Sequence, residues 1–138
     1  MTDATPTPQR PAIVGRRGRA LLFFALLDFV YCVGLMTRPR PYAGVYASAA
    51  HVVPLWVWAY LWAAVGIILF VGAFSRGQDT WAFVAAMALK MLWGSLGFFA
   101  WINGDDPFGY LWAVVWFGFA YLVHTIAGGI PTSPGRER

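Results

Sequence analysis

Four long runs of apolar residues dominate the pattern of hydrophobic and polar positions along the chain. They cover residues 20–36, 52–74, 81–102 and 109–127, and the segments between them are polar and contain Gly, Pro, Asp and Arg. At about 1.5 Å per residue, runs of this length can cross a bilayer as helices. The pattern therefore predicts an all-α fold, a polytopic membrane protein in which four transmembrane helices form an antiparallel bundle over residues 20–127.

The connections between the runs carry turn and capping signals. Residues 75–80 predict a tight hairpin, with Gly77 in the left-handed conformation and Asp79 capping the next helix. Asp106 and Pro107 predict the N-cap and the first residue of the last helix. Connections this short make consecutive helices antiparallel neighbours.

One connection, residues 37–51, is longer. Its apolar and aromatic positions at helical spacing predict a short interfacial helix, and an irregular loop with aromatic contacts explains them equally well; these positions are Tyr42, Val45, Tyr46 and Ala49.

The two ends of the chain are polar and basic. We expect residues 1–19 and 128–138 to be flexible cytoplasmic tails. If the N-terminus is inside, the cytoplasmic flanks hold seven arginines and the outer flanks hold two, Arg38 and Arg40. Because cytoplasmic flanks are enriched in Arg and Lys, this bias predicts a protein of the cell (cytoplasmic) membrane with both termini cytoplasmic.

Composition supports this class. The chain is 59% hydrophobic and 12% charged, against about 25% charged in soluble domains. An ordinary soluble domain and a disordered chain are therefore excluded. The net charge of +4 lies in the flanks of the apolar runs, so it indicates topology and contact with lipid rather than binding of nucleic acid. A single cysteine, Cys32, allows neither an intramolecular disulfide nor a cysteine zinc site.

Only two charged residues, Asp28 and Lys90, interrupt the apolar runs. A charge at the centre of a membrane helix costs about 2.5–3.5 kcal/mol, so each residue needs a partner. Both lie about 12–14 Å from the cytoplasmic side, and we therefore predict an intramembrane ion pair. Two interpretations stay open: a structural lock between the helices, or a proton or ion site, including a polar lining in an oligomer.

Small residues recur at helical spacing on two runs. They predict close helix packing and offer contacts for a homo-oligomer; they are Ala59, Ala63, Gly66, Gly94 and Gly97.

Tryptophans gather near the ends of the runs, as expected for anchors at the membrane interface. The predicted anchors are Trp56, Trp58, Trp101 and Trp112 on the outer side and Trp81 on the inner side. Trp93 lies deeper, where a cation–π contact with Lys90 is expected.

Sites for chemistry are not evident in the sequence. His51 and His124 lie too far apart along their helices to ligate one iron, and motifs for nucleophiles, phosphates, zinc or dinucleotides are absent. We therefore expect a non-enzymatic protein without catalytic residues, metal or cofactor.

Three segments resemble small four-helix membrane proteins of actinobacterial phages and prophages: residues 21–31 (LLFFALLDFVY), 53–58 (VPLWVW) and 89–94 (LKMLWG). The resemblance spans about residues 19–130. Some small phage membrane proteins are holins, which oligomerise and open the cytoplasmic membrane. The resemblance thus implies a holin-like oligomer that permeabilises the membrane.

Two alternatives remain. Small multidrug-resistance proteins also have four helices and an acidic residue in the first, so Asp28 could serve a small proton-coupled transporter, although their glutamate motif has no match here. The protein could also be an accessory or scaffold subunit that binds an unidentified membrane partner.

Overall fold

The computed structural model describes residues 15–75 and 79–128, and every regular element in these ranges is a helix. The helices are α1 (Arg16–Met36), α2 (Val45–Val52), α3 (Leu55–Phe74), α4 (Thr80–Ile102) and α5 (Gly109–Gly128). Four of them, α1, α3, α4 and α5, are long and apolar enough to cross a membrane. The prediction of an all-α fold with four such helices is confirmed.

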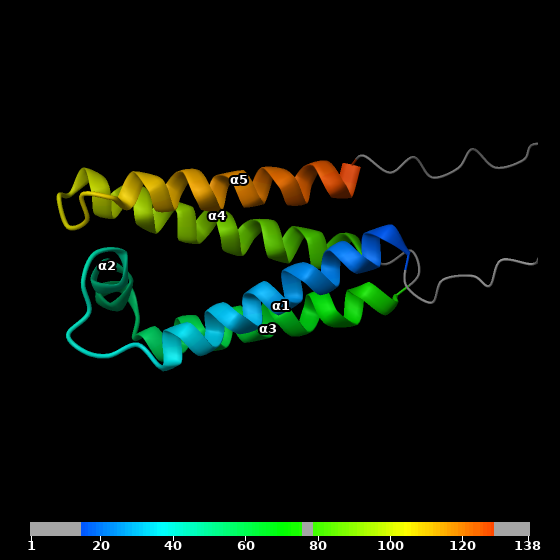
Figure 1. Ribbon diagram of the computed structural model, residues 1–138, viewed down its shortest axis with the longest axis horizontal. Helices are drawn as coiled ribbons and strands as arrows, with labels where there is room; N and C mark the ends of the chain where they lie inside the picture. Colours follow the sequence, from blue (N-terminus) through cyan, green and yellow to red (C-terminus); the bar gives the residue numbers. More distant parts are fainter. Residues whose placement is uncertain (1–14, 76–78, 129–138) are drawn as a thin grey trace, which may run out of the picture.

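The long helices form two pairs. α1 packs along α3 and α4 packs along α5, and each long helix runs opposite to the one before it (Figure 1). α3 also contacts α4 and so joins the pairs. At the end where α1 finishes and α3 begins, the short helix α2 lies between the pairs and contacts both α3 and α4 (Figure 1). The helical interpretation of the long connection is therefore correct, and α2 helps to hold the pairs together.

α1 begins earlier than expected. It starts at Arg16 rather than at residue 20, so the last residues of the expected tail continue the helix. Three of the four added residues are arginines, which are good helix formers, and the N-cap residue Gly15 is extended, with ψ 178°. The rest of the two predicted tails, residues 1–14 and 129–138, lies outside the described residues, as does Gly77.

The second apolar run divides into two helices. It was expected to begin at residue 52, but Val52 ends α2 and α3 begins at Leu55. Pro54 separates them, because a residue before proline is disfavoured in the helical conformation. Val53 is accordingly extended, with φ −149° and ψ 154°.

Glycines bring the paired helices close together. A Cβ at Gly66 of α3 would lie 3.0 Å from the ring of Phe29 on α1. On α4, a Cβ at Gly97 would lie 2.8 Å from Trp112 Cβ on α5, and one at Gly94 would lie 2.7 Å from the Phe117 ring. These glycines therefore serve contacts between helices of the same chain.

Of the two predicted capping aspartates, Asp79 makes no capping hydrogen bond, and Asp106 makes a local one together with a distant one. Asp79 is the N-cap residue of α4, but its side chain caps no backbone N–H and lies 3.0 Å from Arg17 Nε instead. Asp106 accepts hydrogen bonds from the backbone N–H of Val45 (3.1 Å) and of Phe108 (2.9 Å). α5 begins only at Gly109, so Pro107 precedes the helix. The Asp79 carboxylate therefore ties α4 to α1, whereas the Asp106 carboxylate accepts a local backbone N–H, as predicted, and also one from the start of α2.

Candidate functional site

The two charged residues of the apolar runs meet in the interior. Lys90 Nζ donates a hydrogen bond to Asp28 Oδ1 over 2.5 Å, and both side chains are 0% exposed. Asp28 lies on α1 and Lys90 on α4, so the contact joins the α1–α3 pair to the α4–α5 pair. Asp28 Oδ2 is also buried and has no hydrogen-bond partner among the described residues.

Aromatic rings surround the lysine. Lys90 Nζ lies 5.0 Å from the centroid of a Trp62 ring and 5.9 Å from the centroid of the Phe24 ring. A cation at such a distance from an aromatic face is stabilised by the ring quadrupole, most strongly when water is excluded. The expected partner, Trp93, packs on Trp62 instead, with ring centroids 5.9 Å apart.

Sequence reasoning overlooked Trp62. Its depth in the apolar run could have identified it, because it lies seven residues from the start of α3, or about 10 Å along the helix. Tryptophans that anchor a helix at the interface lie nearer its ends. A tryptophan at that depth is therefore expected to have a role in the core.

Next to the ion pair lies a cluster of four aromatic residues. Tyr31 is at its centre, with ring centroids 4.4 Å from Trp62, 5.5 Å from Trp93 and 5.1 Å from Trp116. Its hydroxyl lies 3.5 Å from that of Tyr46 on α2. The indole Nε1 atoms of all three tryptophans are buried without a hydrogen-bond partner in the part of the chain that the structure describes. The interior is thus tightly filled but contains unsatisfied polar atoms beside the charges.

The predicted anchor tryptophans divide into two groups. Trp56, Trp81 and Trp101 are exposed, and Trp112 is half-buried. Trp58 is only 5% exposed, and its Nε1 donates a hydrogen bond to the Ala49 carbonyl over 3.0 Å. Trp58 is therefore not an interfacial anchor, because it holds α2 against the start of α3.

The predicted small residues lie largely in the interior. Gly66, Gly94 and Gly97 are buried at the helix contacts described above, Ala59 is fully buried, and Ala63 is half-buried.

Candidate metal ligands are dispersed. Both histidines, His51 and His124, are exposed, and Cys32 is a buried free thiol. Among residues 15–75 and 79–128, His, Cys, Asp and Glu side chains do not gather in groups of three or more that could hold a metal ion.

What the site can do follows from its geometry. The buried ion pair can lock two helix pairs together, and its free carboxylate oxygen can accept one further hydrogen bond or a proton. In comparisons with known proteins, neither a family model, nor a curated protein, nor a solved structure matches the chain.

Proposed function

We propose that this chain is a small integral membrane protein that crosses the bilayer four times and works without catalytic chemistry. The observation that carries the proposal is the outward surface of the long helices. Large apolar side chains cover it on each of them, among them Phe23, Leu26, Ile67, Val84 and Val114. Soluble monomers rarely expose contiguous apolar patches of more than a few hundred Å², whereas lipid tails cover such a surface at no cost.

The proposed orientation places both termini in the cytoplasm. The start of α1 and the end of α5 lie at the same end of the molecule (Figure 1). That end also carries Arg17, Arg19 and the α3–α4 connection, whereas Arg38 and Arg40 follow α1 at the other end. The excess of arginine on the first side supports a cytoplasmic location for it.

Labelling of introduced cysteines tests the topology. In a Cys32→Ser background, Thr80→Cys and Asn103→Cys place one exposed thiol at either end of α4. A membrane-impermeant maleimide added to whole cells should label the Asn103→Cys protein and should label the Thr80→Cys protein only after permeabilisation. Reversed labelling would overturn the orientation, and complete extraction of the protein by alkaline carbonate would overturn membrane insertion.

For the activity, we propose permeabilisation of the cytoplasmic membrane by a homo-oligomer, as in holins. The resemblance to phage membrane proteins supports this, together with the apolar perimeter that protomers could share. Because the small residues of α3 and α4 are occupied inside the protomer, contacts between protomers must use the outward faces.

Inducible expression tests this activity. Induction should collapse the membrane potential and stop growth at a reproducible time, whereas another four-helix membrane protein made at the same level should not. Normal growth and potential, with the protein abundant in the membrane fraction, would exclude permeabilisation.

A proton-coupled transporter is the second candidate, and one observation favours it: the buried, unpartnered Oδ2 of Asp28. Intramembrane carboxylates mark proton pathways in many transporters. Efflux of a cationic dye should then exceed that of empty-vector cells and be lost in the double variant Asp28→Asn with Lys90→Met, which removes the carboxylate without leaving a buried charge unpaired. Efflux equal to that of empty vector would exclude this candidate.

A further inference from the structure

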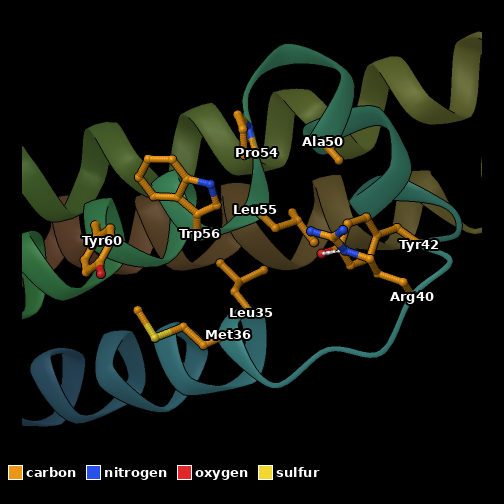
Figure 2. Close-up of a pocket in the computed structure, with 9 residues that line it drawn as sticks. All are labelled: Leu35, Met36, Arg40, Tyr42, Ala50, Pro54, Leu55, Trp56 and Tyr60. Carbon is orange, nitrogen blue, oxygen red and sulfur yellow. Dashed lines mark hydrogen bonds between the residues drawn. The ribbon is translucent and has the colours of Figure 1, made fainter.

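A lateral groove opens where α1 ends and α3 begins. It has a volume of about 490 Å³ and separates the last turn of α1 from the first turns of α3. Leu35 and Met36 of α1 form one wall, while Trp56 and Tyr60 of α3 form the other (Figure 2). An apolar channel between two helices has the shape that an extended acyl chain requires.

The mouth of the groove is cationic. Arg40, in the connection between α1 and α2, reaches it together with Tyr42 (Figure 2). Arg40 Nε donates a hydrogen bond to the Tyr42 hydroxyl over 3.2 Å, which fixes the guanidinium and raises the pKa of Arg40 above its usual value. Within the described ranges the terminal nitrogens of Arg40 have no hydrogen-bond or carboxylate partner. They are therefore available to an anion.

Acidic residues at this end of the molecule do not neutralise that charge. Asp106 accepts hydrogen bonds from backbone N–H groups, one of them at the start of α2. Asp105 accepts a hydrogen bond from the Ser48 hydroxyl on α2. Arg38, the other cation of the connection, lies 3.6 Å from the centroid of the Tyr46 ring and does not line the groove. The groove mouth thus carries one uncompensated positive charge.

In the proposed topology, the groove lies at the level of the lipid headgroups and of the first part of the acyl chains. Trp56 and Tyr60 lie in the first two turns of α3 and are exposed, as is typical of residues at the level of the lipid headgroups. The apolar walls then extend into the hydrocarbon while Arg40 stays among the phosphates. A cation above an apolar channel complements an anionic headgroup above an acyl chain.

We propose that this groove binds one anionic glycerophospholipid of the outer leaflet, with its phosphate at Arg40 and an acyl chain between α1 and α3. This inference rests on the proposed membrane topology. A free phosphate ion would meet only the mouth and leave the apolar walls unused.

Lipid retention by the purified full chain in detergent tests the proposal. Native mass spectrometry should detect one phosphatidylglycerol retained in preference to phosphatidylcholine. Arg40→Gln should lower retention of phosphatidylglycerol about fivefold. Arg38→Gln is the matched control, since it removes the same charge from the same exposed connection outside the groove, and it should retain lipid as the wild type does.

A second pair of variants tests the apolar part. Met36→Trp fills the groove without changing charge and should lower retention severalfold, whereas Met91→Trp, at an exposed position on α4, should not. Equal loss in the two arginine variants, no preference between the lipids, or competition by inorganic phosphate alone would overturn the proposal. Cysteine labelling detects a wrong topology separately, because lipid retention in detergent does not depend on orientation.

Discussion

Neutralising the buried pair one residue at a time should destabilise the protein far more than neutralising both residues together. The variants are Asp28→Asn, Lys90→Met and the combination of the two. Since both side chains are 0% exposed, either single substitution leaves a charge buried without its partner. The combination removes both charges and keeps the site filled, so it should be much less harmful than the sum of its parts.

The distance between the two charges determines how much free energy of unfolding their separation should cost. At the 2.5 Å that separates Nζ and Oδ1, Coulomb attraction is about 7 kcal/mol for an effective dielectric constant of about 20. Desolvation of the two charges offsets most of this, and loss of one partner in such pairs typically costs about 3–5 kcal/mol. We expect each single variant to lose free energy of unfolding in that range, and the double variant to lie within about 1 kcal/mol of the wild type or above it.

Tryptophan fluorescence provides the assay. Trp62, Trp93 and Trp116 pack together beside the pair, so their emission should report the loss of the core during unfolding by denaturing detergent in bicelles. The interaction energy follows from the four unfolding free energies as a double-mutant cycle. Single variants within about 1 kcal/mol of the wild type, or a double variant no more stable than the weaker single variant, would refute the interpretation of the pair as a lock.

Three further predictions can be tested in the same unfolding assay. Gly97→Leu should lower the free energy of unfolding by at least about 1–3 kcal/mol, because a side chain there meets α5. The control Gly118→Leu has no atom within 4 Å of its Cβ and should lower it by less than about 0.5 kcal/mol. Equal losses would contradict the close α4–α5 contact. Gly44→Ala should lower the free energy of unfolding by at least about 1–3 kcal/mol, because Gly44 has φ 58° and a Cβ there would overlap the Asp106 carboxylate. Combined with Asp106→Ala, the loss should be smaller than the sum of the two single losses. Strict additivity would argue against that overlap. Trp58→Phe should cost about 1 kcal/mol through the lost hydrogen bond to α2, and an unchanged midpoint would show that this bond contributes nothing.

The number and length of the long helices could be predicted from the sequence. Which side chains face the interior and which face outward could not. The four long helices follow from apolar runs whose lengths suit a bilayer. Asp28 and Lys90 could be matched by depth because the apolar runs hold no other charge. Trp56 and Trp58, however, occupy the same depth on one helix and differ by about 200° in direction, at about 100° per residue. Trp58 is buried because it faces α2 and Trp93 of α4, while Trp56 faces outward.

The Asp106 carboxylate likewise has one partner that the sequence predicts and one that it does not. The sequence around Asp106 predicts that its carboxylate accepts backbone N–H groups, and it does so. The second of those groups belongs to Val45, 61 residues away in the sequence. Local capping rules contain no information about such a partner, because it depends on how α2 lies between the helix pairs. Gly44, just before Val45, is needed there because any side chain would meet the carboxylate.

The unsatisfied oxygen of Asp28 separates the two interpretations of the ion pair. A lock needs only the contact between Oδ1 and Nζ, and a second partner for Oδ2 would strengthen it further, since an unpaired buried polar atom costs free energy. Proton transfer, in contrast, requires a carboxylate oxygen that is free to accept a proton. The variant with both residues neutralised distinguishes these roles because it removes the carboxylate while restoring stability. If that variant folds and keeps the activity of the wild type, the pair is a lock; if it folds and loses proton-coupled transport, Asp28 takes part in transport directly.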